Sequence, residues 1–208
     1  MNNHHIKAIL FDLGNVVIDF DHWIAVKRIH RFSDNDPQKI FNLFFDSELT
    51  GLFEEGRISP EDFFLKIKEF LNLRLNYAEF LPIWNEIFFV SDKNLAVYEL
   101  AKSLKNHYQI ALISNINILH FEYIRKNFFY LLDIFPKIVT SYECGFRKPH
   151  PKIYQLSLDY LEVKPEEVFY IDDRRELINI AKELGIKGFV FKGIEDLKEN
   201  LLDSGIII

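Results

Sequence analysis

Polar side chains follow three apolar runs of this 208-residue chain, each at the point where the run ends. They are Asp12 after 6–11, Ser114 and Asn115 after 108–113, and Asp172 and Asp173 after 168–171. Ligands of an open parallel sheet bind beyond the carboxyl ends of its strands. If the three runs are parallel strands, these side chains therefore meet at one edge of the sheet.

Three carboxylates at such an edge predict a bound cation. Like charges at short range repel each other and raise each other's pKa, and a cation relieves that cost. Mg²⁺ binds through a few carboxylates together with phosphate oxygen and water. Lys148 lies in a loop before an expected helix and brings a positive charge to the same place. Carboxylates, magnesium and a lysine together are typical of a phosphoryl-transfer site.

The elements that must position these residues alternate along most of the chain. Helical patterns separate the apolar runs, and Gly185 has the character of a helix C-cap. The expected strands cover 6–11, 108–113, about 137–140, 168–171 and 188–191. The expected helices cover 92–105, a segment after Asn115, 151–161, 175–184 and the end of the chain. This alternation predicts an α/β fold with a doubly wound parallel sheet.

The segment 21–90 has a different pattern, with few strand-like runs and many helix starts. Asp36 and Ser59 each precede a proline, and Asn76 and Ser91 are further N-cap candidates. We expect a small all-helical cap subdomain over 21–90, inserted into a core domain that comprises 1–20 and 91–208. The many aromatic residues of the insert are expected to form its core, and some of them to line a substrate mouth.

The composition limits the class of protein and the kinds of partner that it can bind. The chain is 49% hydrophobic and 27% charged, which excludes disordered and low-complexity classes. A net charge of −6 argues against nucleic acid as the main partner. Cys144 is the single cysteine and fits a reducing compartment. The N-terminus has no signal-peptide pattern, and no apolar run approaches the roughly 18 residues of a membrane helix. We expect a cytoplasmic monomer or small homo-oligomer that binds no membrane.

Four short motifs, taken together, resemble those of the haloacid-dehalogenase-like hydrolase superfamily. They are FDLGNV at 11–16, SN at 114–115, GFRKPHPKIY at 145–154 and YIDD at 170–173. The helical insert directly after the first motif resembles the C1-capped members. FDLGNV resembles a bacterial group that includes phosphatases of sugar phosphates such as glucose 1-phosphate. The resemblance therefore implies a magnesium-dependent phosphatase that acts on small phosphorylated metabolites.

The resemblance also implies a role for each matching residue. Asp12 is the expected nucleophile, which forms an aspartyl-phosphate, and Lys148 neutralises it and the phosphoryl group. Ser114 and Asn115 are expected to bind phosphate, as are backbone N–H groups from Leu13 to Asn15. Expected magnesium ligands are Asp12, the carbonyl of Gly14, Asp172 and Asp173.

Two positions depart from the superfamily's pattern. Gly14 stands where most of its phosphatases carry a second Asp as general acid and base, and Leu177 stands where an Asn or Asp often supports the metal. Without an acid, the enzyme should prefer leaving groups that tolerate negative charge, such as aryl, acyl and anomeric phosphates. Alternatively, a cap residue within Glu54–Arg57 supplies the proton; otherwise that segment is a solvated turn.

Two other functions remain open. A 2-haloacid dehalogenase also uses an Asp nucleophile and needs no second Asp, but it needs no metal and typically lacks the acidic pair that Asp172 and Asp173 provide. A catalytically weak or silent binding protein is the other alternative. Gly14 and Leu177 motivate that alternative, whereas the presence of Asp12 and Lys148 opposes it.

Overall fold

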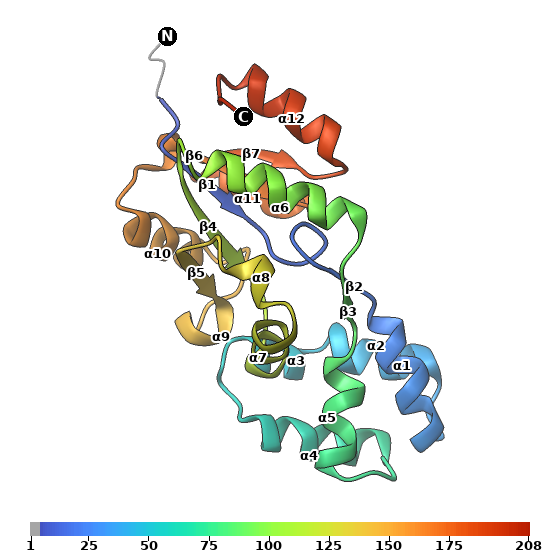
Figure 1. The fold of residues 1–208 in the computed structure, drawn as a ribbon. Helices are drawn as coiled ribbons and strands as arrows, with labels where there is room; N and C mark the ends of the chain where they lie inside the picture. Colours follow the sequence, from blue (N-terminus) through green and yellow to red (C-terminus); the bar gives the residue numbers. More distant parts are fainter. Residues whose placement is uncertain (1–4) are drawn as a thin grey trace.

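Five parallel strands form the central sheet in the computed structural model, in the order β5-β4-β1-β6-β7 (Figure 1). Their bounds are β1 Ala8–Phe11, β4 Gln109–Ser114, β5 Lys137–Thr140, β6 Val168–Asp172 and β7 Lys187–Val190. Each predicted strand is therefore confirmed, with ends that differ by at most two residues. The structure describes residues 5–208. Residues 1–4 lie outside the described part. The expected core segment 1–20 and the N-terminal segment without a signal-peptide pattern both begin there.

Helices cover both faces of this sheet, as the doubly wound prediction requires. Side chains alternate between the two faces of a strand. Ile9 and Phe11 of β1 therefore pack in one hydrophobic cluster, and Ala8 and Leu10 pack in another. The first cluster includes residues of α6 (Asp92–Leu104), α7 (Ile118–Asn127), α8 (Phe129–Leu132) and α12 (Ile194–Asp203). The second includes residues of α10 (Pro151–Leu161) and α11 (Arg175–Glu183).

A helical insert follows β1 and lies at one end of the sheet (Figure 1). Its helices are α1 His22–Ile29, α2 Pro37–Phe45, α3 Glu48–Glu54, α4 Pro60–Leu71 and α5 Tyr77–Asn85. Asp36 and Ser59 accept hydrogen bonds from the backbone of the turns that they begin, and Asn76 forms a capping box with Glu79. These caps satisfy N–H groups that a helix start would otherwise leave without a partner. The predicted helical insert is confirmed, except that Phe88–Phe89 near its end form a short strand.

Aromatic side chains form the core of the insert. Trp84 is fully buried and packs against Phe44, with ring centroids 5.2 Å apart, and against Phe63 at 5.1 Å. Phe45 and Phe88 are only partly buried and line a cavity between the insert and the sheet. The aromatic residues therefore divide between the two roles expected of them.

A two-stranded antiparallel ribbon, absent from the sequence prediction, connects the insert to the core. It pairs β2 (Asp19–Phe20) with β3 (Phe88–Phe89). Asp19 accepts hydrogen bonds from Lys93 at 2.6 Å and from Ser91 at 2.7 Å. The two segments that connect the core to the insert are therefore held together by hydrogen bonds at the start of α6.

Short connecting elements complete the described chain. They are the 3₁₀ turns His30–Phe32 and Pro165–Glu167 and the one-turn helix α9 (Ser141–Cys144). Among residues 5–208, no helix combines the length and apolarity needed to cross a membrane.

Candidate active site

Asp12 stands immediately after β1, at the edge of the sheet nearest the insert. Its backbone N–H donates to the carbonyl of Ile171 at 2.8 Å, which holds it beside β6. The following loop turns back on itself, because the carbonyl of Leu13 accepts from Val17 and Ile18. Asp12 as a whole is only 8% exposed. The loop therefore presents one carboxylate from the centre of the sheet.

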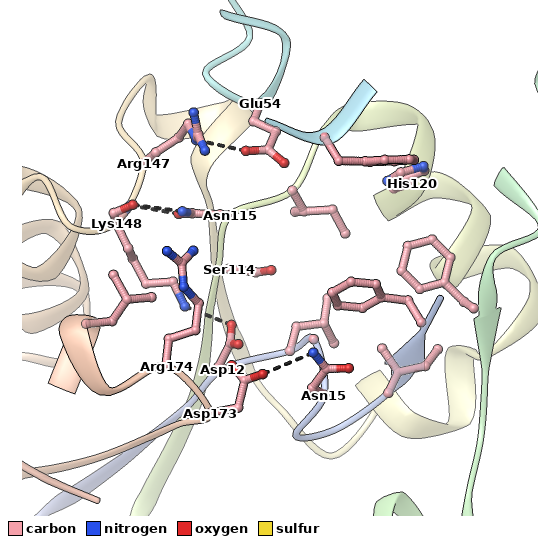
Figure 2. Close-up of a pocket in the computed structure, with 18 of the residues that line it drawn as sticks. Asp12, Asn15, Glu54, Ser114, Asn115, His120, Arg147, Lys148, Asp173 and Arg174 are labelled. Carbon is pink, nitrogen blue, oxygen red and sulfur yellow. Dashed lines mark hydrogen bonds and ion pairs between the residues drawn. The ribbon is translucent and has the colours of Figure 1, made fainter. Parts of the chain in front are cut away.

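Lys148 is the cation that faces Asp12, as the sequence predicts. Its Nζ donates to Asp12 Oδ1 and to Asp172 Oδ2, each at 2.8 Å, although the residue is only 3% exposed. Asn115 holds the lysine backbone: its amide donates to the Lys148 carbonyl at 2.8 Å, and its Oδ1 accepts from the Lys148 N–H at 2.7 Å (Figure 2). In this structure Asn115 positions Lys148.

The predicted acidic cluster forms. Asp12, Asp172 and Asp173 each place one carboxylate oxygen within 4.8 Å of the other two. Asp172 is fully buried, and Lys148, the Tyr170 hydroxyl and the Arg174 N–H donate to its oxygens. Asp173 is half-buried and accepts one hydrogen bond at 3.0 Å (Figure 2).

The donor set fits a hard divalent cation. Asp12 and Asp173 have fewer hydrogen bonds than Asp172, so they are the carboxylates best able to ligate it, with Asp172 in support. Asn15 donates the hydrogen bond to Asp173, which supports the carboxylate although position 177 is a buried leucine. The backbone N–H of Asn15 donates to the carbonyl of Ile18 at 2.7 Å. The N–H of Asn15 is therefore already used inside the loop. Of the backbone donors expected to bind phosphate, those of Leu13 and Gly14 remain.

Electrostatics at this edge reflect burial and crowding. Burial raises the pKa of Asp12 to about 7; Lys148 opposes the rise, and Asp172 and Asp173 add to it. Burial alone would lower the pKa of Lys148, but the Asp12 and Asp172 carboxylates raise it above its ordinary value. Lys148 is therefore protonated at neutral pH. A cation beside Asp12 would favour its carboxylate form.

A cavity of about 190 Å³ opens over these residues. Its polar side is built from the predicted residues Asp12, Gly14, Asn15, Ser114, Asn115, Lys148 and Asp173. Such a volume is small for a ligand pocket, so a phosphate with a few carbon atoms suits it. All predicted site residues except Asp172, which lies beneath Lys148, thus meet at one cavity.

Residues that the sequence analysis did not single out as site residues line the rest of the cavity. They come from the insert, the ribbon, helix α7 and the loops around the cavity, and are Ile18, Phe20, His22, Phe45, Phe88, Ile116, His120, Arg147 and Arg174. His22 stacks on Phe45 with ring centroids 3.7 Å apart. Arg147 lies within the GFRKP motif, directly before Lys148, so the sequence could have indicated that Arg147 also lies near the site. The other residues converge only when the insert folds over the sheet.

Glu54, the last residue of α3, reaches the same cavity. Its carboxylate forms an ion pair with Arg147 Nε at 2.8 Å (Figure 2). Gly51 permits this approach, because a Cβ there would lie 2.7 Å from the Arg147 guanidinium. Gly56, with φ of +66°, lies against the backbone carbonyl of Tyr142 in the core. The segment Glu54–Arg57 therefore places one residue in the site and a glycine against the core.

Comparison with known proteins identifies the family. Residues 6–185 match the model of the haloacid dehalogenase-like hydrolases. The chain belongs to this family. The resemblance of the four motifs and the prediction of a hydrolase are thereby confirmed at the family level.

Relatives within the haloacid dehalogenase-like family cover nearly the whole chain. A D-ribitol-5-phosphate phosphatase of Bacteroides thetaiotaomicron is 26% identical over 94% of this chain and 97% of its own. A glyceraldehyde 3-phosphate phosphatase of Pyrococcus furiosus is 29% identical, over 90% of this chain and 81% of its own. A family enzyme of B. thetaiotaomicron crystallised with magnesium and inorganic phosphate superposes with a TM-score of 0.80 at 28% identity. That comparison covers 94% of this chain and 98% of the other.

Proposed function

We propose that this chain is a magnesium-dependent phosphatase that hydrolyses small phosphorylated sugars or polyols through an aspartyl-phosphate. The observation that carries the proposal is the meeting of Asp12, Lys148 and Asp173 at one small cavity. The relatives support it, because two of them are phosphatases of short phosphorylated carbon chains and a third was crystallised with magnesium and phosphate.

Each residue has a role that its contacts allow. The Asp12 carboxylate attacks phosphorus and forms the acyl phosphate. Lys148 remains protonated between Asp12 and Asp172 and neutralises charge on the transferring group. Ser114 offers a hydroxyl to a phosphoryl oxygen. Magnesium, when bound by Asp12, the Gly14 carbonyl and Asp173, with Asp172 in support, would neutralise further negative charge.

We further propose a division of labour along the chain, with chemistry in 1–20 and 91–208 and substrate selection in the cap 21–90. His22, Phe45 and Glu54 of the cap line the cavity, while the acidic cluster comes entirely from the core. The cap side of the cavity mixes an aromatic side chain, Phe45, with the polar side chains of His22 and Glu54, and such a mixture suits a short hydroxylated carbon chain. A glucose 1-phosphate is a candidate within this class, together with terminal phosphates of shorter polyols.

The dehalogenase alternative is disfavoured by Asp173. A half-buried carboxylate beside Asp12 repels a second anion unless a cation separates them. A metal-independent enzyme for haloacids, which are themselves anionic, gains nothing from this arrangement. The silent alternative is disfavoured because Asp12, Lys148 and Asn115 retain a connected set of hydrogen bonds at the cavity.

Phosphate release tests the proposal. The substrates are ribitol 5-phosphate, glyceraldehyde 3-phosphate, glucose 1-phosphate and p-nitrophenyl phosphate, with magnesium and with excess chelator. We expect turnover of at least one, lost on chelation and restored by magnesium. Asp173→Asn should raise the magnesium concentration needed for half-maximal turnover, whereas Asp203→Asn on the exposed side of α12 should not. No turnover of any ester, or equal rates in excess chelator, would contradict the proposal.

A further inference from the structure

We propose that Glu54 of the cap is the proton donor to the leaving oxygen, in place of the carboxylate that position 14 lacks. This inference rests on the proposed phosphatase function and adds a residue to its mechanism. The sequence leaves the proton source open between no acid at all and a cap residue of 54–57. The structure favours Glu54, because it is the residue of that segment that lines the cavity.

The position of Glu54 is the first support. Figure 2 shows its carboxylate at the end of the cavity away from Asp12, with Ser114 between them in this view. In phosphoryl transfer the attacking and leaving oxygens lie roughly in line, on opposite sides of phosphorus. If Asp12 attacks from the sheet, the leaving oxygen points toward the cap. Glu54 is the carboxyl group that the cap presents to the cavity there.

The space around Gly14 is the second support. A Cβ at this position would lie 2.6 Å from a ring carbon of Phe20. That ring is itself held between His22 at 4.7 Å and Phe88 at 6.1 Å, measured between centroids. A carboxylate side chain therefore does not fit on this loop as it is folded. The proton must come from another residue or from water.

The surroundings of Glu54 are the third support. Its side chain is 21% exposed, and burial raises its pKa above the ordinary value. Arg147 before α10, Arg174 before α11 and Lys148 lower the pKa, while Glu55 on the same helix end raises it. Among the described residues Arg147 Nε has no hydrogen-bond partner of good geometry, although it lies 2.8 Å from the Glu54 carboxyl group. The net direction is upward, so Glu54 keeps its proton to a higher pH than an exposed glutamate does.

Glu54 gives up one proton and regains one in each turnover. An Asp12 oxygen forms a bond to phosphorus while the bond from phosphorus to the leaving oxygen breaks. That oxygen takes the electron pair and the proton of Glu54, which becomes a carboxylate. In the second half-reaction water takes the place of the departed alcohol, and Glu54 accepts its proton as the water oxygen attacks phosphorus. The bond between phosphorus and the Asp12 oxygen breaks, and Asp12 keeps the electron pair as a carboxylate. Inorganic phosphate leaves, and both Asp12 and Glu54 return to their starting forms.

Substrates that differ in leaving group test the role. A general acid contributes about 10²–10⁴-fold when the leaving group is a poor one, and little when it is good. We expect Glu54→Gln to lower kcat/KM for an alkyl phosphate such as ribitol 5-phosphate by about 10²–10⁴-fold. For 2,4-dinitrophenyl phosphate, whose leaving group needs no proton, we expect a loss of less than about tenfold. Glu61→Gln, an exposed acid in the first turn of α4, should change neither.

A pH profile separates catalysis from positioning. With alkyl phosphate, wild-type kcat/KM should fall as pH rises and Glu54 loses its proton, and this limb should be absent in Glu54→Gln. Glu54→Ala tests the same prediction if the Gln variant is poorly folded. Equal losses with both esters, or an unchanged pH profile, would overturn the inference and leave Glu54 a positioning residue. A wild-type protein that hydrolyses neither ester would instead refute the proposed phosphatase function.

Discussion

Lys148 shows at the scale of one residue why the site is costly to build. A buried ammonium is tolerated here because Asp12 and Asp172 both accept from it. Removing one partner of a buried ion pair leaves an uncompensated charge, which typically costs about 3–5 kcal/mol. The residue is thus needed for the folded state as well as for the chemistry proposed.

We therefore predict that Lys148→Met abolishes turnover and lowers the free energy of unfolding by about 3–5 kcal/mol without added metal. Urea denaturation followed by circular dichroism measures the change. Lys102→Met, on an exposed face of α6, is the matched control and should fall within about 0.5 kcal/mol of wild type. A Lys148→Met protein as stable as this control would show that the buried charges are compensated in another way.

Gly14 has no room for a side chain in the folded loop. Gly14→Asp should not create a working general acid, because its Cβ meets the ring of Phe20. Overpacking of this kind typically costs about 1–3 kcal/mol. We expect a lower melting temperature and no gain in kcat/KM on alkyl phosphates. Phe20→Ala removes the ring and provides the space. Gly14→Asp should therefore cost less stability in a Phe20→Ala protein than it does in wild type. A single variant with wild-type stability and higher activity would contradict this account.

Elements were predictable where the hydrophobic pattern is long enough to have a period. The five core strands and the helices that begin after Asp36, Ser59, Asn76 and Ser91 all form where the sequence places them. The ribbon of Asp19–Phe20 with Phe88–Phe89 was missed, because two-residue strands carry no alternation and their pairing spans the whole insert. Asp12, Lys148, Asp172 and Asp173 were found because strand ends gather polar residues at one edge.

Site residues at the contact between insert and core were harder to predict. His22 and Phe45 of the insert and His120 of α7 reach the cavity only through the way helices pack, and nothing in their spacing indicates which face points inward. Glu54 lay within a segment for which the sequence left two interpretations open. The contact with Arg147 places Glu54 at the cavity and not in solvent, and the two residues are far apart in the sequence.

His120 of α7 gives a prediction about the contact between elements. Its Nε2 lies 3.0 Å from the carbonyl of Trp84 on α5, and its Nδ1 lies 3.1 Å from the Asn117 amide. The amide oxygen of Asn117 accepts the His120 backbone N–H, so the amide nitrogen faces the ring. The ring is therefore neutral, donating from Nε2 and accepting at Nδ1. Burial lowers its pKa to about 3, with the Trp84 carbonyl opposing.

The pKa of His120 is lower in the folded chain than in the unfolded chain, where it lies near 6.5, so the unfolded chain gains a proton first as pH falls. The free energy of unfolding is therefore highest above pH 6.5 and declines as pH falls toward 3. From pH 7 to pH 5 the protonation of the unfolded chain costs about 2 kcal/mol for one such residue. We predict that His120→Gln loses less stability over this range than wild type, by about that amount. Urea denaturation at both pH values measures it, and His107→Gln, at an exposed position, should behave as wild type does. Parallel losses in wild type and His120→Gln would show that His120 is not held neutral.

The whole molecule joins an acidic sheet edge to a helical insert that lies against it. The core supplies Asp12, Lys148 and the acidic pair, and the insert contacts the core through the ribbon, the Glu54–Arg147 ion pair and His120. A cavity of about 190 Å³ remains between the two. Exchange of the insert's aromatic wall would change which carbon chain fits, without moving the groups proposed to cleave the ester.

The central claim is that Asp12 transfers the phosphoryl group, and phosphate release by Asp12→Asn tests it most directly. The substitution keeps the shape of the side chain and removes the attacking charge. Purified wild type and Asp12→Asn are compared with saturating magnesium on the best substrate of the panel, after circular dichroism has shown that both are folded. We predict measurable turnover for wild type and none above background for the variant. Phosphate release by folded Asp12→Asn at a rate near that of wild type would contradict the account.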